Sequence, residues 1–167
     1  GRAAFIRSWS DGCALVCYQG HGAPRQLADE VLFLSTHIPP LTNGRRLPVS
    51  MAYSCTVAEF DAPELQSMCE HLIASTSGGA IATMGATEET FAGQNADYNV
   101  EVWHALFADG TTTKVGLGIV HQLAKNRSPI ADGLNNEKYV LLGDPALTLL
   151  APEALVQFTT RPDSLQA

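Results

Sequence analysis

The sequence predicts an α/β domain in which a mostly parallel, open sheet has helices on both faces. Four apolar runs of strand length, at 13–19, 48–54, 80–84 and 139–142, alternate with segments of helical spacing. Strands that are separated by helical crossovers usually form a parallel sheet covered on both sides. The length of 167 residues is that of a single domain.

Each strand is predicted from its composition and from the residues beside it in the sequence. Residues 13–19 are apolar almost throughout, which predicts a central strand buried on both faces. The run 48–54 begins with Pro48, which a strand tolerates at its first position. Gly78 and Gly79 precede the strand at 80–84, and the strand at 139–142 is short.

Helices are expected between these strands. Residues 2–9 form a short amphipathic stretch, and 29–34 is a helix-like run inside an irregular connection. Asp61 and Pro63 suit a helix start, because Asp caps free N–H groups and Pro lacks one. The apolar residues that follow recur on one helical face: Leu65, Met68, Cys69, Leu72 and Ile73. Two further helices are predicted at 100–107 and 115–125.

Composition excludes several classes of protein. Hydrophobic residues make up 46% and charged residues 16% of the chain, so intrinsic disorder is excluded. The net charge is −7 without a basic run, which argues against a nucleic-acid partner. The apolar runs are too short to span a membrane, so no membrane partner is expected. No Cys pair or His spacing indicates zinc, and neither a metal nor another cofactor is expected.

Two reactive side chains follow the first two predicted strands. His21 ends the first and Cys55 the second, so both are expected at the carboxyl edge of the sheet, where ligands bind. A neutral imidazole can take the proton of a thiol and later give one to a leaving amine. The N–H groups of Gly22 and Cys55 are candidates for an oxyanion hole. The plainer alternative is a buried thiol beside an unrelated loop histidine.

Four segments carry a family resemblance. Residues 18–22 (YQGHG) resemble the Y-x-G-H-G motif, and 54–61 (SCTVAEFD) the S-C-x-x-G-x-F-D motif, of the gingipain family of cysteine peptidases in the caspase-like clan. The stretches 78–87 and 139–147 are similar to further family landmarks, in family order.

The resemblance extends from about residue 12 to residue 150. It implies a caspase-like catalytic subdomain at 1–150 followed by a tail at 151–167. It also implies a cysteine endopeptidase with a His–Cys dyad at His21 and Cys55, an acyl-enzyme intermediate on Cys55 and a polypeptide substrate.

The sequence departs from the family in two ways. Ala58 stands where the family often has Gly. Family domains also have strands and helices before the histidine strand, whereas here one helix precedes it. We therefore expect that the sheet lacks its N-terminal strands and that a companion fragment or chain completes it, as in a processed precursor. A bare sheet edge would otherwise favour aggregation.

The expected loop at 87–98 is the candidate wall of a specificity pocket. The resemblance implies that its aromatic residue, Phe91, flanks the pocket for the residue before the scissile bond. Glu88, Glu89 or Asp97 could pair with a basic side chain there, which predicts cleavage after a basic residue. The plainer alternative is a solvated acidic loop.

Two other functions stay open: a non-catalytic subunit used in assembly or activation, and another Cys-dependent acyl transferase. The compartment also stays open. With Cys55 set apart, the other cysteines are odd in number, which favours a reducing compartment. The family resemblance implies secretion.

Overall fold

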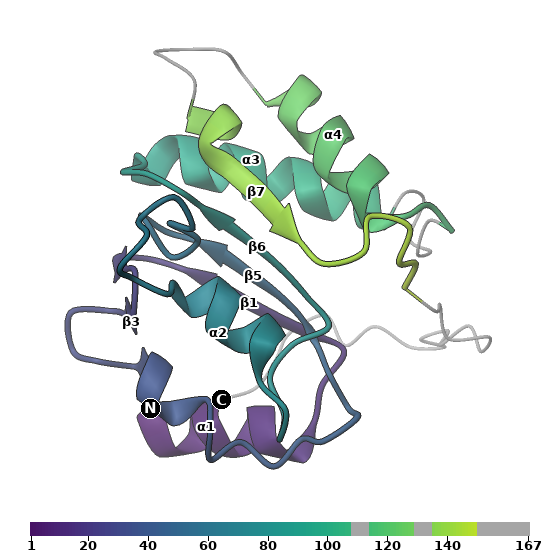
Figure 1. Ribbon diagram of the computed structural model, residues 1–167. Coiled ribbons are helices and arrows are strands. Elements are labelled where there is room, and N and C mark those ends of the chain that lie inside the picture. The colour runs from purple at the N-terminus through teal and green to yellow at the C-terminus, as the bar shows by residue number, and fades with distance from the viewer. Residues whose placement is uncertain (108–113, 129–134, 150–167) are drawn as a thin grey trace, which may run out of the picture.

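The main sheet is mixed and mostly parallel (Figure 1). The computed structural model describes residues 1–107, 114–128 and 135–149. Four strands form this sheet, in the order β1 (Leu15–Gln19), β5 (Val49–Tyr53), β6 (Ala82–Ala86) and β7 (Tyr139–Leu142). The first three are parallel, whereas β7 is antiparallel to β6. The predicted α/β architecture is thus confirmed. The predicted tail at 151–167 lies outside the described residues.

Helices cover both faces of the sheet (Figure 1). They form two layers: α3 (Ala92–Leu106) and α4 (Leu117–Arg127) on one face, α1 (Arg2–Asp11) and α2 (Met68–Ala74) on the other. Successive side chains of a strand point to opposite faces. Met51 of β5 therefore packs in the apolar cluster of α3 and α4, whereas Ala52 packs in the cluster of α1 and α2. Both are buried, so the core has two halves separated by the sheet.

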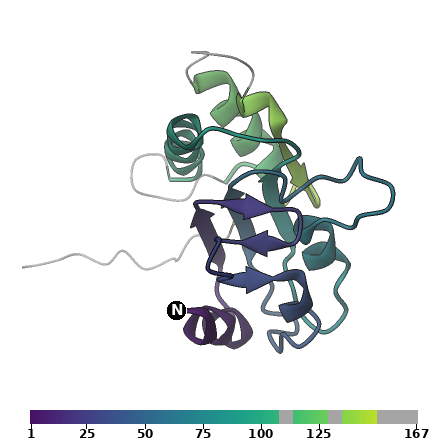
Figure 2. The same cartoon turned by 90° about the vertical axis from the view of Figure 1, so that its left-hand side faces the viewer.

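A small antiparallel sheet lies beside the main one, and Figure 2 shows its strands. They are β2 (Gly22–Ala23), β3 (Gln26–Leu27) and β4 (Phe33–Leu34), and a short 3₁₀ helix, η1 (Ser35–His37), follows. The helix predicted at 29–34 is therefore wrong. Phe33 is fully buried and stacks on Trp9 with ring centroids 5.0 Å apart. This tertiary contact, together with pairing to Leu27, overrides the local helical pattern.

Helix α2 begins later than predicted from Asp61 and Pro63. Its N-cap is the buried Ser67, whose hydroxyl accepts a hydrogen bond from the Glu70 N–H (3.4 Å) and donates one to Glu70 Oε2 (2.7 Å). The Glu70 carboxylate also accepts the Ser67 N–H at 2.8 Å. This capping box fixes the helix start at Met68, so the predicted start is wrong.

Helix α3 begins at Ala92, well before the predicted start at residue 100. Its buried face includes Asn95 and Tyr98 as well as Val102. Apolar spacing does not reveal the first turns of α3, because its buried face there includes the polar Asn95. The segment 87–98, predicted as a loop, therefore contains the beginning of a helix. A second short 3₁₀ helix, η3 (Asn135–Lys138), leads into β7.

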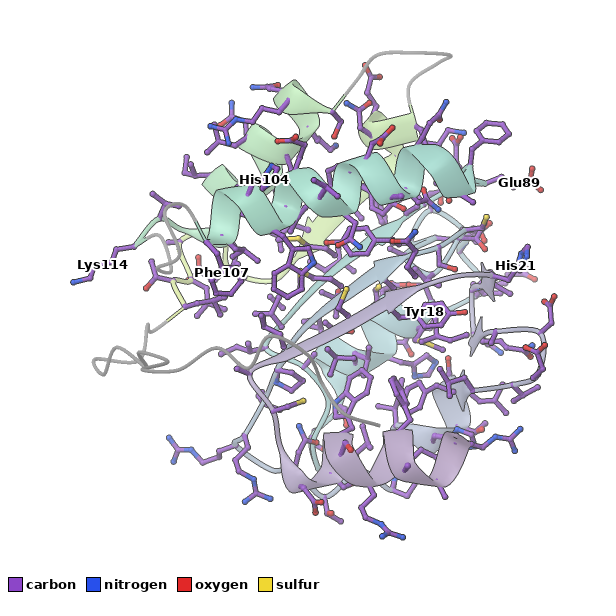
Figure 3. The ribbon with its side chains drawn as sticks, turned by 180° about the vertical axis from the view of Figure 1, so that it is seen from behind. Tyr18, His21, Glu89, His104, Phe107 and Lys114 are labelled. Carbon is purple, nitrogen blue, oxygen red and sulfur yellow. The ribbon has the colours of Figure 1, made fainter. Side chains whose placement is uncertain are left out.

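Strand β1 lies at the edge of the sheet, as the view from behind shows (Figure 3). Within the described residues it pairs with β5 alone. Val16 is buried, but Cys17 and Gln19 are exposed. The prediction of a strand buried on both faces is therefore wrong within the described residues, because the face of β1 that bears Cys17 and Gln19 is not fully covered there. The helices of the described ranges are too short or too polar to cross a bilayer.

Candidate active site

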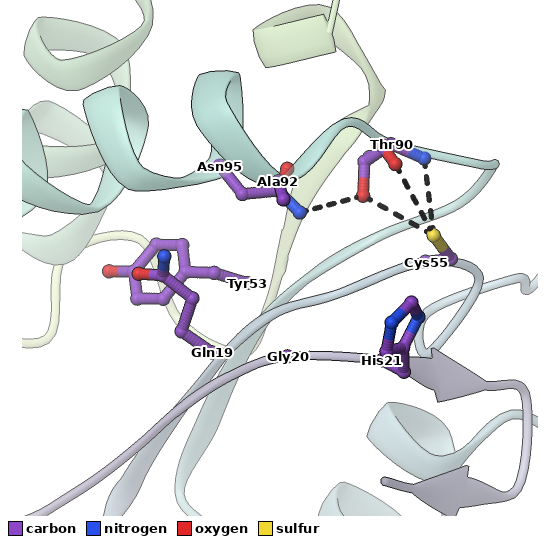
Figure 4. Close-up of a pocket in the computed structure, with 8 residues that line it drawn as sticks. All are labelled: Gln19, Gly20, His21, Tyr53, Cys55, Thr90, Ala92 and Asn95. Atoms are coloured by element: carbon purple, nitrogen blue, oxygen red, sulfur yellow. Dashed lines mark hydrogen bonds between the residues drawn. The ribbon is translucent and has the colours of Figure 1, made fainter. Parts of the chain in front are cut away.

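A cavity of about 220 Å³ lies at the carboxyl ends of β1 and β5 (Figure 4). Its walls come from the ends of both strands and from the segment that follows β6 into α3. The lining residues are Gln19, Gly20, His21, Tyr53, Cys55, Thr90, Ala92 and Asn95. Parallel strands bring their carboxyl ends to one edge, so residues far apart in sequence meet here.

His21 follows β1 and has a firmly held backbone. Its carbonyl accepts the Tyr18 hydroxyl at 2.7 Å and the Ala28 N–H at 2.9 Å. The side chain itself is exposed, and in Figure 4 the imidazole points toward the sulfur of Cys55. The structure thus brings His21 and Cys55 to the same cavity.

Cys55 occupies a tight turn directly after β5. The next residue, Thr56, has φ 51°, a left-handed conformation that is uncommon for a β-branched side chain. The Thr56 N–H donates to the carbonyl of Glu88 at 3.1 Å, and the Ala58 N–H donates to Ala86 at 2.9 Å. These two bonds join the turn after β5 to the end of β6. They place the Cys55 side chain beside the segment 87–91.

The sulfur of the half-buried Cys55 lies among the polar groups of Thr90. The Thr90 N–H donates to Sγ at 3.4 Å. The Thr90 carbonyl lies 3.5 Å from Sγ, where it can accept the thiol proton, and the Thr90 hydroxyl lies 3.6 Å away. One residue therefore supplies three polar groups to the sulfur (Figure 4).

The predicted oxyanion donors also lie at this edge. Among the described residues, no acceptor takes the backbone N–H of Cys55. Gly22 begins β2, and a Cβ at this position would meet Ser54 Oγ and would lie 3.1 Å from Val57 Cγ1. Glycine is therefore needed for the close approach of the two turns. The role of these N–H groups in catalysis stays a prediction.

The predicted specificity residues border the cavity but do not line it. Phe91 is 63% exposed, and Glu89 is exposed as well (Figure 3). The Glu88 carboxylate lies 3.7 Å from Lys138 Nζ, which also donates to the Glu89 carbonyl at 2.7 Å. Their roles in specificity stay predictions.

Asp97 lies on α3 and is exposed. It is two positions beyond Asn95, which lines the cavity, and helical residues two apart do not share a face. Its side chain is therefore on a different face of α3 from the cavity. Its predicted role also stays a prediction.

Beyond His21 and Cys55, sequence reasoning assigned no site role to the other lining residues, which are Gln19, Gly20, Tyr53, Thr90, Ala92 and Asn95. Its position could have indicated Tyr53, because it is the last residue of β5, at the edge of the sheet where Cys55 follows. Thr90 and Asn95 required the true start of α3. Among the described residues, no group of three His, Cys, Asp or Glu side chains could hold a metal ion.

An open, mostly parallel sheet between two helical layers, with a thiol and an imidazole at its carboxyl edge, is the arrangement of the caspase-like class. Within that class, the pattern of Peptidase family C25 matches residues 2–150, and the chain belongs to this family, the gingipain family. No curated protein matches the sequence.

Solved structures of the same fold are similar to the chain. The Arg-specific cysteine proteinase gingipain R superposes with a TM-score of 0.77 at 20% identity, covering 89% of this chain and 36% of that one. A complex of Porphyromonas gingivalis RgpB pro- and mature domains gives 0.75 at 20% identity, covering 89% and 37%. A structure described only as a protease gives 0.75 at 18% identity, covering 95% and 40%. The chain thus spans 36–40% of the length of these structures.

Proposed function

We propose that this chain contains the catalytic dyad of a cysteine endopeptidase, with Cys55 as nucleophile and His21 as general base. The observation that supports this best is that both side chains line one cavity, with the imidazole directed at the sulfur (Figure 4). Membership of Peptidase family C25 supports the same reaction.

The proposed reaction proceeds in two stages. His21 takes the proton of Cys55, and the thiolate attacks the carbonyl carbon of the scissile bond. The N–H groups of Gly22 and Cys55 stabilise the oxyanion that forms. His21 then gives its proton to the leaving amine, which produces an acyl-enzyme on Cys55. In the second stage His21 takes a proton from water, the hydroxide attacks the thioester, and the thiolate leaves.

We propose that cleavage follows a basic residue. Glu88 and Glu89 come directly before Thr90 of the cavity wall, and the chain is acidic overall. Phe91 could pack along the aliphatic stem of Lys or Arg. Gingipain R, one of the similar structures, is described as Arg-specific.

A peptide library tests this preference. We expect cleavage chiefly after Arg or Lys, and weaker selection for them in the triple variant Glu88→Gln, Glu89→Gln, Asp97→Asn. Cleavage chiefly after apolar residues would contradict the proposal. Unchanged selectivity in the triple variant would instead exclude these three acids as its source.

We propose that a further polypeptide segment pairs with the outer edge of β1. Within the described residues this edge has no partner strand, and Cys17 and Gln19 on it are exposed. Unpaired strand edges readily accept another strand. One of the similar structures is a complex of pro- and mature domains, which supports a companion segment and processing of a precursor.

A covalent probe tests the dyad. A peptidyl acyloxymethyl ketone should alkylate Cys55 of the full-length protein, as identified by peptide mass spectrometry. Cys55→Ala should abolish both labelling and peptide hydrolysis, whereas the control Cys13→Ala, at a half-buried cysteine outside the cavity, should keep both. Full hydrolysis by Cys55→Ala would overturn the assignment. Absence of both labelling and hydrolysis in the wild type would favour a non-catalytic subunit.

A further inference from the structure

A chain of polar side chains extends from the sulfur of Cys55 into the core beside β7. Asn95 Nδ2 donates to Thr90 Oγ1 at 3.0 Å. Asn95 Oδ1 accepts from Asn135 Nδ2 at 3.1 Å and from the Tyr139 hydroxyl at 2.8 Å. Asn95 and Asn135 are 4% and 5% exposed, and Tyr139 is fully buried. Such a network in the interior has few alternative arrangements, because an unpaired polar group there is costly.

The direction of each hydrogen bond in this network follows from the backbone N–H of Phe91, the group farthest from Cys55. The backbone N–H of Phe91 can only donate, and it donates to Asn135 Oδ1 at 2.9 Å. The other amide atom of Asn135 is therefore its NH₂ group, which makes Asn95 Oδ1 an acceptor. Asn95 then presents its own NH₂ group to Thr90. Burial raises the pKa of Tyr139, so its phenol stays neutral and can donate to the same Asn95 oxygen.

These directions determine what the Thr90 hydroxyl does. It accepts from Asn95, so its own proton is free for another acceptor. Among the described residues, the nearby acceptors are Cys55 Sγ, 3.6 Å away, and the oxygen of Tyr139, which also makes a side-chain hydrogen bond with Thr90. A thiolate accepts a hydrogen bond more strongly than a neutral phenol does, which favours the sulfur. We infer that the network from Phe91 through Asn135 and Asn95 makes the Thr90 hydroxyl a hydrogen-bond donor to Cys55, so that Thr90 stabilises the thiolate and Asn95 and Asn135 are positioning residues.

This inference rests on the proposed role of Cys55 as nucleophile and gives it a second source of activation. The Thr90 N–H and hydroxyl both favour a negative sulfur, because hydrogen bonds donated to a charged group stabilise that form. The Thr90 carbonyl acts in the opposite sense, because it accepts the proton of the neutral thiol. Removing the hydroxyl alone therefore isolates the contribution of the network.

Among the described residues, three titratable side chains share the surroundings of the sulfur: His21 from the segment after β1, Tyr53 from β5 and Tyr139 from β7. Burial raises the pKa of both tyrosines, so they stay neutral across the working range. Glu88 and Lys138 pair with each other and do not line the cavity. The contribution of His21 is therefore separated from that of Thr90 by repeating the test without the imidazole.

The test measures alkylation of Cys55 by iodoacetamide from pH 5 to pH 10 in the full-length protein, with each cysteine quantified by peptide mass spectrometry. Thr90→Val keeps the shape and the backbone donor but loses the hydroxyl. We expect the midpoint of the Cys55 profile to rise by roughly one pH unit, the scale of one charge-assisted hydrogen bond. Thr90→Ser keeps the hydroxyl and should therefore have the wild-type midpoint. The His21→Gln background should show the same rise, because the effect does not pass through the imidazole.

Thr87→Val is the matched control. The Thr87 hydroxyl donates to the Lys138 carbonyl at 3.1 Å in the same segment, without contacting the sulfur. Its loss should lower stability but leave the midpoint unchanged. An equal rise in Thr87→Val and Thr90→Val would show that loosening of the segment, rather than the hydroxyl, is responsible.

Asn135→Asp tests the direction of the network. A carboxylate still accepts the Phe91 N–H but cannot donate to Asn95. The side-chain amide of Asn95 should therefore flip by about 180°, so that its oxygen accepts the Thr90 proton. The sulfur then loses its donor, and the midpoint should rise as in Thr90→Val. In the Thr90→Val background, Asn135→Asp should add only the smaller effect of its distant charge. Full additivity of the two changes would overturn the inference.

The outcomes separate this inference from the proposed function, since alkylation needs no substrate. Peptidase activity that depends on Cys55, together with unchanged midpoints in Thr90→Val and Asn135→Asp, would overturn the network alone. Shifted midpoints in a protein that hydrolyses no peptide would support the network and contradict the peptidase.

Discussion

The hydroxyl of Tyr18 donates a hydrogen bond to the backbone carbonyl of His21 at 2.7 Å. Tyr18 belongs to β1, whereas His21 lies beyond the end of that strand (Figure 3). The bond therefore ties the segment that bears the imidazole to the sheet itself. The N–H of Ala28, directly after β3, donates a second hydrogen bond to the same carbonyl and ties the His21 segment to the small sheet. The position of His21 is thus fixed through its backbone, while its exposed ring stays accessible to a substrate.

Tyr18→Phe should loosen the position of His21 with a small effect on folding. The lost hydrogen bond is worth about 0.5–1.5 kcal/mol of unfolding free energy. We expect kcat of peptide hydrolysis to fall several-fold while KM changes little, because the imidazole acts in the chemical step. Tyr139→Phe is not a suitable control, since its hydroxyl belongs to the Asn95 network. A Tyr18→Phe protein with wild-type kcat would show that the Ala28 bond alone is sufficient.

Gly22→Ala should reduce both stability and activity. The added methyl group would meet Ser54 Oγ, directly before Cys55, and the side chain of Val57, two residues after it. Overpacking of this kind costs about 1–3 kcal/mol, and here it would also move the two proposed catalytic segments apart. Urea denaturation and peptide hydrolysis measure the two effects.

Gly93→Ala is the control for that substitution. Nothing lies within 4 Å of a Cβ at Gly93, which is an exposed position in α3. Replacing a helical glycine by alanine should stabilise the protein by up to about 1 kcal/mol and leave hydrolysis unchanged. Equal losses of activity in both variants would contradict the steric explanation.

His121 should make the protein less stable in acid. Its Nδ1 lies 2.6 Å from the Tyr98 hydroxyl, and burial, with a smaller contribution from Lys125, lowers its pKa from 6.5 to about 4. The unfolded chain therefore binds this proton more readily than the folded one. The unfolding free energy should fall between pH 6.5 and about pH 4, by about 2–3 kcal/mol from this group. His121→Gln should remove that part of the pH dependence.

Denaturant titrations at pH 7, 5.5 and 4.5 measure the effect. His104→Gln serves as the control, because the His104 side chain is 65% exposed and lies 3.6 Å from Glu101 on its own helix. It should keep the wild-type pH dependence. If His121→Gln lost as much stability in acid as the wild type, another buried group would have to be responsible.

The open edge of β1 should cause association when residues 1–167 are expressed alone. Charged side chains on an exposed edge strand discourage edge-to-edge pairing. We therefore expect Cys17→Lys to shift the chain toward monomer in light scattering. Ile119→Lys changes an exposed apolar residue on α4, away from this edge, and should have a smaller effect. A monomeric wild-type chain would contradict the proposed need for a companion strand.

The sequence alone was sufficient to predict the strands of the main sheet and the edge of the sheet at which His21 and Cys55 meet. Strand patterns are local, and parallel strands necessarily bring their carboxyl ends together. The short strand β7 was predicted with its observed bounds, Tyr139–Leu142. That β7 is antiparallel was decided by the tertiary structure, since strand direction depends on the path of the preceding chain.

Only the tertiary structure determined which residues surround the sulfur. The stacking of Phe33 on Trp9 replaced a predicted helix by a strand. The true start of α3 placed Asn95 behind Thr90, and hydrogen bonds from residues far along the chain fixed the direction of both. A local pattern contains the spacing of side chains along one element. It does not contain the donors and acceptors that other elements supply, and those decide what chemistry the sulfur of Cys55 can perform.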